Sequence, residues 1–228
     1  MSGEQQFHFT IGPVQGFVAQ ARRTRDFWAG SFILSWLSAV AMEAVRQQGG
    51  CVKFPAPDEA FMAALRGEAT GNDPPRQGTV PNRFMAEVGE DFDPDVVTTT
   101  VLDAWQALAE AVWTGDDLDA VAGPETRAIW DRQVAGFWEL SWAVTDGPDS
   151  AVLDRRKNWR SHYPPAEPGT KCHVMDGWQE LSGAERPGQE GEAFWQALRQ
   201  RPGGGVFFRE KRCIHCGECA QACPVGAI

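Results

Sequence analysis

The chain has 228 residues, of which 43% are hydrophobic and 11% aromatic, so its composition is that of a folded protein and excludes a disordered one. Its length allows one large or two small domains. The formal net charge of -10 excludes general, sequence-blind adhesion to nucleic acid, so any RNA contact must be local.

The first predicted element is a short strand, Phe7–Ile11. It meets Gly12-Pro13 and gives way at once to helical periodicity, so the chain turns and starts a helix within two residues. Three arginines follow, and at helical spacing they place positive charge on two sides of the first turns.

The next elements alternate between helix and strand. Apolar residues at helical spacing predict a helix over Ile33–Val45, and short β-type runs predict strands at Cys51–Phe54 and Arg83–Val88. Between these strands, Gly67–Thr79 has the composition of an exposed connection. The order of strand, helices, strand and strand fits the opening of a ferredoxin-like βαββαβ domain.

Two apolar stripes predict that residues 98–143 are helices packed on each other or on the sheet. The first stripe includes Trp105 and Val112, and the second includes Trp130 and Trp138. Asp116-Asp117 lies between the stripes and reads as a polar turn. Residues 145–192 are rich in Gly, Pro and charge and show no sustained periodicity.

Two basic patches stand out in this acidic chain. They consist of Arg22, Arg23 and Arg25, and of Arg155, Arg156, Lys157 and Arg160, with Trp159 set among the second group. Arginine interleaved with an aromatic ring suits a nucleic-acid backbone with stacked bases, so both patches are candidate RNA or partner contacts. The alternative is a solvated charged loop.

Four cysteines lie within eleven residues near the C-terminus, spaced as in bacterial ferredoxins: Cys213, Cys216, Cys219 and Cys223, the last followed by Pro224. This spacing predicts thiolate ligands of a 4Fe-4S cluster. Zinc ranks second, because structural zinc sites commonly split their ligands into two distant pairs.

In two-cluster ferredoxins the fourth cysteine of such a run serves another cluster, and this chain has no second run. The other cysteines are Cys51 and Cys172. We therefore hypothesise that either Cys172 or Cys223 completes a single cluster.

The sequence also bears on location. Residues 1–6 are polar and lack the order of a signal peptide, and Ser31–Val45 is interrupted by polar residues too often for a membrane span. We expect a cytoplasmic protein without membrane contact, in which cysteines act as ligands or free thiols rather than disulfides.

Five segments carry a resemblance to a known family. They are Ile11–Leu37, Val80–Phe84, Ile129–Gln133, Arg155–Arg160 and Trp178–Gly183. Over about its first 210 residues the chain resembles the large, polymerase/cyclase-like subunit of type III-B (Cmr) CRISPR interference complexes, at the start of its first palm domain. Several separate matches in the right order are more specific than one short pattern.

The resemblance implies antiviral defence within a ribonucleoprotein, with the other Cmr subunits, guide RNA and target RNA as partners. It also implies half of a nucleotide pocket at Asp26 and Ser31, where the family's first palm turns between its first helices. The alternative is that Asp26 caps a helix and Ser31 begins the next one. ATP and Mg²⁺ would bind only with a second palm.

The chain lacks the Gly-Gly-Asp-Asp turn of the family's cyclase site and the His-Asp pair of its nuclease domain, so we expect no complete enzyme in this chain. The family pattern stops near Val206–Arg212. We therefore expect a truncated or rearranged relative, or a fragment.

The predicted fold is α+β. A partial ferredoxin-like palm occupies residues 1–97, a helical insertion and irregular connection residues 98–200, and a cysteine-rich tail with half a ferredoxin motif residues 201–228. The predicted function is that of an RNA- and nucleotide-binding part of the CRISPR subunit. The alternative is a 4Fe-4S protein of electron transfer or redox sensing.

Overall fold

The structure is a computed structural model that describes residues 5–21, 24–68, 75–147, 151–158, 166–173, 175 and 177–201. It divides into two compact units. Unit 1 consists of Met1–Trp105 and Trp138–Tyr163, and unit 2 consists of Gln106–Phe137 and Pro164–Ile228. The predicted domain boundaries at residues 97 and 200 stay a prediction.

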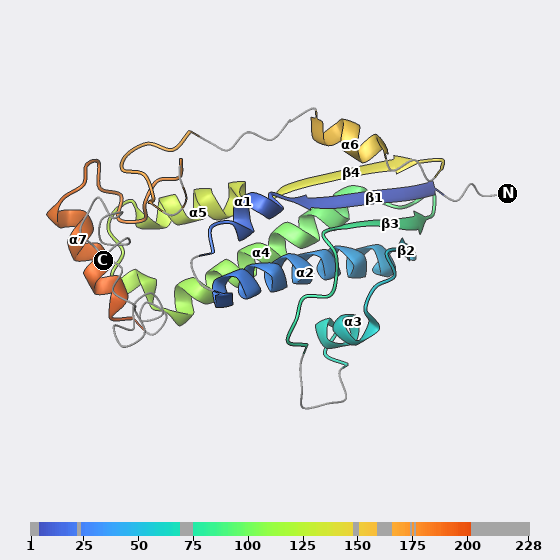
Figure 1. The fold of residues 1–228 in the computed structure, drawn as a ribbon, viewed down its shortest axis with the longest axis horizontal. Helices are drawn as coiled ribbons and strands as arrows, with labels where there is room; N and C mark the ends of the chain where they lie inside the picture. The colour runs from blue at the N-terminus through green and yellow to red at the C-terminus, as the bar shows by residue number, and fades with distance from the viewer. Residues whose placement is uncertain are drawn as a thin grey trace. The chain divides into compact units, whose positions relative to one another are not determined.

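Unit 1 is built on a four-stranded antiparallel sheet (Figure 1). Its strands are β1 (Gln5–Gly12), β2 (Cys51–Phe54), β3 (Arg83–Val88) and β4 (Glu139–Thr145), in the spatial order β2-β3-β1-β4. The three strands predicted from the sequence are confirmed, and β2 and β3 have the predicted bounds. The α+β class is confirmed as well.

Strand β4 corrects the prediction of helices throughout residues 98–143. The whole of β4 pairs with β1, from Gln6 opposite Thr145 to Gly12 opposite Glu139. Its sequence, E-L-S-W-A-V-T, places β-branched and aromatic residues on a pleated surface. Pairing with the buried strand β1 determines the conformation of β4. The helical spacing of apolar residues before β4 does not predict this pairing.

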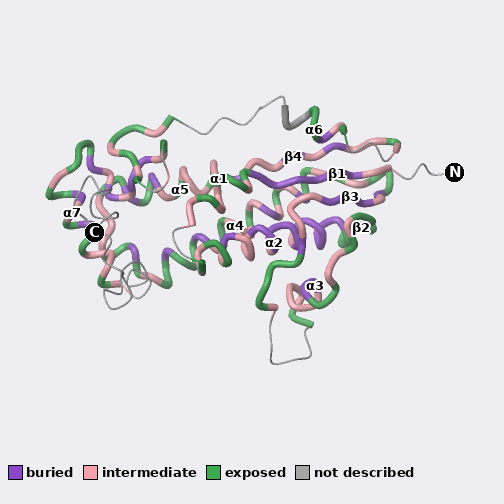
Figure 2. The backbone as a smooth tube through the Cα atoms, in the orientation of Figure 1, coloured by how far each residue is buried: buried purple, intermediate pink, exposed green. Residues whose placement is uncertain are grey.

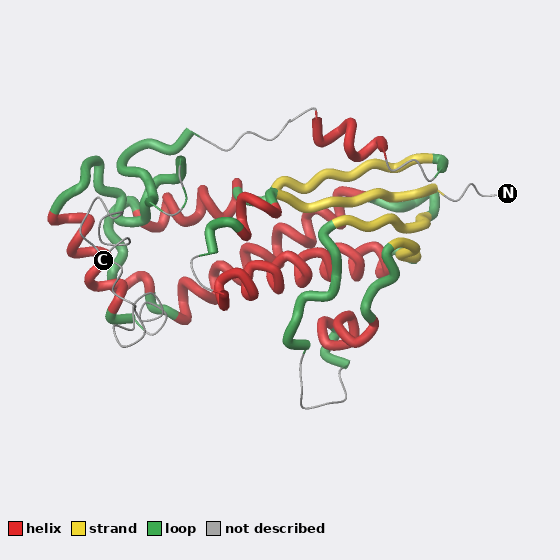
Figure 3. Tube along the Cα trace, viewed as in Figure 1, coloured by secondary structure: helices red, strands yellow, loops and turns green. Residues whose placement is uncertain are grey.

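The helices of unit 1 connect and cover the strands (Figure 3). They are α1 (Val14–Val18), α2 (Thr24–Gln47), α3 (Glu59–Leu65), the first half of α4 (Pro94–Gly115) and α6 (Ala151–Asn158). Helix α2 contains the predicted helix over residues 33–45. Sequence periodicity missed α3 and α6, which have seven and eight residues, because two helical turns show too few repeats of a stripe.

The inner face of the sheet holds the main core of unit 1. The rings of Phe7 and Phe9 on β1 lie 6.1 and 5.2 Å from the ring of Phe84 on β3, and all three side chains are buried. Helix α2 contacts β1, β2 and β3, and it contributes the fully buried Leu37. Figure 2 shows that β1 is buried along most of its length.

Helix α6 covers part of the outer face. On β3, buried residues alternate with less buried ones, so Arg83 points away from the core face that Phe84 occupies. The Arg83 guanidinium donates to Asp154 of α6 at 2.8 Å, and α6 contacts β4 and β1. Leu153 of α6 and His8 of β1 are each 1% exposed. Both faces of β1 are therefore covered.

Unit 2 contains the end of α4, a 3-10 turn η1 (Leu118–Ala120), α5 (Thr126–Gly136) and α7 (Gln189–Arg199). The ring of the buried Trp113 lies 5.6 Å from that of Trp130, and the Arg127 guanidinium lies 4.8 Å from the Trp113 ring. Asp117 has φ 50° in the turn after α4, so the predicted polar turn is confirmed.

Among the described helices, α2 over Asp26–Gln47 is long and apolar enough to cross a membrane by length and composition. However, 56% of its most apolar window is buried inside the protein. A core helix that packs on a sheet has these properties.

Candidate nucleotide and RNA contact surface

The end of β1, the middle of α2 and the segment before β3 meet through hydrogen bonds. The Ile11 N–H donates to the Asn82 carbonyl at 3.0 Å, and the Asn82 Nδ2 donates back to the Ile11 carbonyl at 3.2 Å. The buried Ser35 hydroxyl of α2 donates to the Val80 carbonyl at 2.7 Å. Residues 78–82, hereafter the 78–82 segment, are thus hydrogen-bonded to both β1 and α2.

Gly78 shows how closely this segment approaches α2. A Cβ built on Gly78 would lie 2.5 Å from the Ser35 Oγ and 2.8 Å from the Ser31 carbonyl oxygen. Both distances are well below van der Waals contact, so only glycine fits without a shift of the helix. The 78–82 segment therefore fixes the turn of α2 that carries Ser31.

Helix α2 is continuous from Thr24 to Gln47, which corrects the expectation of a turn between two helices at residues 26–31. Asp26 lies in the first turn and Ser31 five residues later, and both are half-buried. At about 100° per residue the two side chains diverge by about 140° around the helix. The structure does not bring them onto one helix face, and their role in nucleotide binding stays a prediction.

Beside Asp26 lie two exposed aromatic rings. Phe27 and Trp28 are 55% and 48% exposed, and the Trp28 ring stacks on that of Phe32 at 5.6 Å. Sequence analysis did not single out Phe27 as a site residue. An aromatic residue two positions after a predicted arginine patch is the sequence signal that would have made Phe27 a candidate.

The structure describes only part of the two basic patches. Arg22, Arg23, Arg160 and the side chain of Arg25 lie outside the described residues, as do the side chains of Arg156 and Lys157. Arg155 is exposed on α6, next to the Asp154 that pairs with Arg83. The second patch is therefore carried in part by a helix that is docked on the outer sheet face.

Two of the family-like segments meet in unit 2. The Arg132 guanidinium of α5 donates to both carboxylate oxygens of Glu167 at 3.0 and 2.8 Å, and to the Gln179 side chain at 3.0 Å. Gln133 donates to Glu167 at 3.1 Å and to the Gln179 carbonyl at 2.8 Å. The Glu167 side chain is 2% exposed, and the hydrogen bond from Arg132 lowers its pKa.

A second buried carboxylate stabilises the same unit. Glu180 accepts from the Trp195 indole N–H at 2.8 Å, from the Ser182 backbone N–H at 3.0 Å and from the Ser182 hydroxyl. The protein itself supplies all of these donors. The polar residues of 129–133 and 178–183 that make these hydrogen bonds therefore stabilise the fold of unit 2.

The candidate cluster ligands Cys213, Cys216, Cys219 and Cys223 lie outside the described residues. Within the described part of the chain, no three His, Cys, Asp or Glu side chains lie close enough to hold a metal. Cys172 is half-buried, and its Sγ accepts the Met175 backbone N–H at 3.4 Å. The role of Cys172 as a cluster ligand stays a prediction.

Comparison with known families agrees with this geometry. A family described as CRISPR-associated protein Cmr2, N-terminal, matches residues 6–110, from β1 into α4. A 4Fe-4S binding domain matches residues 206–228. No curated protein matches the chain.

The first match includes Ile11, α2 and the 78–82 segment, whose mutual hydrogen bonds are given above. The second includes all four cysteines of the ferredoxin-like run. Residues 6–110 are therefore similar to the N-terminal region of CRISPR-associated protein Cmr2, and residues 206–228 of the same chain are similar to a 4Fe-4S binding domain.

Proposed function

We propose that this chain is the N-terminal part of a type III-B CRISPR large subunit. It acts in antiviral defence as an RNA- and nucleotide-binding component of a ribonucleoprotein. One observation carries the proposal: the segments of the Cmr2 match that are far apart in sequence, at Ile11, Ser35 and Val80–Asn82, are joined by hydrogen bonds.

The sheet is a palm of ferredoxin-like βαββαβ type. The order β2-β3-β1-β4 with antiparallel neighbours supports this assignment, because the sheet of a βαββαβ fold has the same strand order and the same antiparallel pairing. Helix α2 links β1 to β2, and α4 links β3 towards β4. Helix α5 then lies in an insertion between α4 and β4.

The beginning of α2 forms half of a nucleotide site. A helix N-terminus offers backbone N–H groups and the positive end of the helix dipole to phosphate oxygens. Asp26 and Ser31 stay the predicted ligand residues, Asp26 for Mg²⁺ and Ser31 for a ribose or base, and a nucleotide that reaches both must extend around α2, because the two side chains lie on different faces of the helix. ATP and Mg²⁺ bind only when a second palm closes the site, so the chain alone is not an active cyclase, and it lacks a Gly-Gly-Asp-Asp turn.

The partners are the other Cmr subunits, guide RNA and target RNA. The basic residues of 155–160 contact RNA phosphates, supported by their position in and after a helix docked on the sheet. We predict that the triple change Arg155→Gln, Arg156→Gln and Arg160→Gln weakens RNA binding about tenfold to fiftyfold at physiological salt, because three phosphate contacts are lost. The measurement is the amount of guide RNA that co-purifies with the tagged chain, compared between the triple variant and the unaltered protein.

The matched control removes three charges elsewhere: Arg76→Gln, Lys171→Gln and Arg186→Gln, all at exposed positions. It is expected to retain guide RNA. Equal retention by both triple variants would count against the proposed contact.

A second candidate function is that of a 4Fe-4S protein in electron transfer or redox sensing, favoured by the match at residues 206–228. Cys213, Cys216 and Cys219 would hold three irons, and Cys172 or Cys223 the fourth. The bound cluster would supply one-electron chemistry, while the cysteines and nearby N–H groups set its position and potential.

Anaerobic reconstitution followed by iron and sulfide analysis tests this site, and four irons per chain are expected. If Cys172 is the fourth ligand, Cys172→Ser lowers the retained iron, whereas Cys51→Ser, at an exposed cysteine, does not. Fewer than four irons in the unaltered chain would reject a 4Fe-4S cluster.

A further inference from the structure

The outer face of the sheet is only half covered by the described residues. Helix α6 contacts β4 and β1, and the β1 side chains beneath it are buried. Over β3 and β2 the register places Cys51 opposite Glu87 and, after a register shift between Val52 and Phe54, it places Phe54 opposite Met85. Cross-strand partners share a face, and Met85 and Glu87 alternate with the buried residues of β3. Phe54 therefore lies on the outer face.

Phe54 is 72% exposed, more than any other large hydrophobic residue in the described part of the chain. Met85 beside it is half-buried. An exposed ring on a strand is a flat surface on which a base can stack, whatever the sequence of the nucleic acid.

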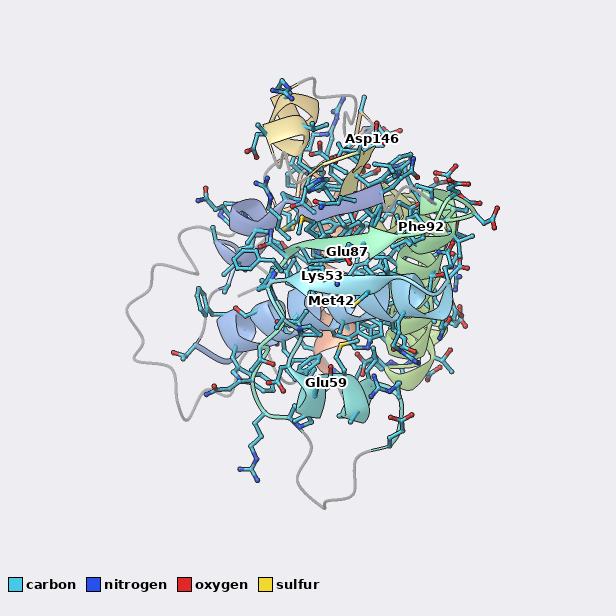
Figure 4. All side chains as sticks on the ribbon, turned by 90° about the vertical axis from the view of Figure 1, so that its right-hand side faces the viewer. Met42, Lys53, Glu59, Glu87, Phe92 and Asp146 are labelled. Atoms are coloured by element: carbon cyan, nitrogen blue, oxygen red, sulfur yellow. The ribbon has the colours of Figure 1, made fainter. Side chains whose placement is uncertain are left out.

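The sequence of α6 adds basic residues beside this face. It has three basic residues against one acidic residue, within a chain whose net charge is -10, and the described basic side chain, that of Arg155, is exposed. On the sheet, Lys53 pairs with Glu87 at 2.5 Å, and Figure 4 shows these two side chains together. The connection from β3 to α4, by contrast, holds Glu90, Asp91 and Asp93. In unit 1 a polyanion is attracted to the α6 side and repelled by this connection.

We propose that the outer sheet face binds single-stranded RNA, with the phosphates along α6 and a base stacked on Phe54. The inference rests on the proposed function and identifies a stacking residue for it. Strands lie about 4.8 Å apart, so β2 is roughly 10 Å from β1, a distance that a few nucleotides bridge.

A protein partner is the competing occupant, because Phe54 and Met85 are apolar and the nearby Lys53 and Arg83 are already paired. The excess of basic over acidic residues in α6, which covers the other half of the same face, favours RNA over a protein partner. Binding of a protein instead of RNA at this face would overturn the proposal.

The test is a fluorescence anisotropy titration of the full chain with a labelled single-stranded RNA. Phe54→Ala is expected to raise Kd about fivefold to thirtyfold, because one stacked base is lost, whereas Phe54→Trp retains binding. Arg155→Gln lowers the slope of log K against log salt by about 0.7, the value for one phosphate contact. The control Val96→Ala, at a 45% exposed apolar residue on α4, leaves Kd unchanged.

The failures of the two proposals are distinguishable. An unaltered chain that binds no RNA and recovers no Cmr subunit rejects the proposed function. An unaltered chain that binds RNA, with the same Kd after Phe54→Ala, rejects only the stacking site. Loss of Cmr subunits from Phe54→Ala with unchanged Kd assigns the face to a protein and also overturns the inference.

Discussion

Gly78 is the residue whose size the candidate site restricts most. An added methyl group would overlap Ser35 and the Ser31 carbonyl, so Gly78→Ala must displace either the 78–82 segment or α2. Overpacking of this kind costs about 1–3 kcal/mol. We predict a decrease of that size in the free energy of unfolding, measured with urea.

Gly89→Ala is the matched control, because an added Cβ meets nothing within 4 Å there. We expect its free energy of unfolding to change by about 0.5 kcal/mol or less. If Gly78→Ala and Gly89→Ala were equally stable, the close approach of the 78–82 segment to α2 would be wrong.

Residue types in the sequence identified charge and thiolate chemistry, but they could not identify contacts between distant residues. Ser35 and Val80 are 45 positions apart, and nothing in their local sequence predicts the hydrogen bond that joins them. Arg132 and Gln179 were noted only as parts of family-like segments. Their structural role depends on Glu167, which sequence analysis did not single out.

At the scale of elements, the ion pair between Arg132 and Glu167 connects α5 to the segment that follows residue 166. Because Glu167 is buried, Arg132→Ala leaves an uncompensated charge, and we predict a loss of about 3 kcal/mol of stability near neutral pH. The control on the same helix is Arg127→Ala. Arg127 is 46% exposed and its ion pairs are solvated, so about 1 kcal/mol or less is expected.

The same pair sets a pH dependence. The pKa of Glu167 is lowered below its ordinary value of 4.5, so its stabilising contribution is present above that pH and is lost as pH falls further towards the folded-state pKa. Urea unfolding between pH 7 and pH 3 should therefore show a shallower decrease in stability for Glu167→Gln than for the unaltered protein. Parallel curves would contradict this role of the carboxylate.

The sequence predicted β2 and β3 with their bounds because turn residues and Pro55 delimit short β-type runs. It did not predict β4, whose conformation depends on pairing with β1, from Gln6 opposite Thr145 to Gly12 opposite Glu139, rather than on its own periodicity. Helix α6 was missed because it is short, polar and stabilised mainly by its buried Leu153.

At the scale of the whole molecule, the chain combines a Cmr2 N-terminal sequence with a ferredoxin-type sequence. Because the net charge is acidic, the proposed RNA contacts must be local, and α6 on the outer sheet face is the described element that we propose for them. The RNA partner inferred from the sequence stays a prediction. The face proposed for it depends on how α6 docks on the sheet, which the sequence alone did not indicate.

The most direct test of the central claim is native mass spectrometry of the unaltered, tagged chain, purified from cells that express the Cmr subunits and a guide RNA. The account predicts an assembly whose mass includes this chain, Cmr subunits and guide RNA. Recovery of the chain without Cmr subunits or RNA, with or without bound iron, would contradict it.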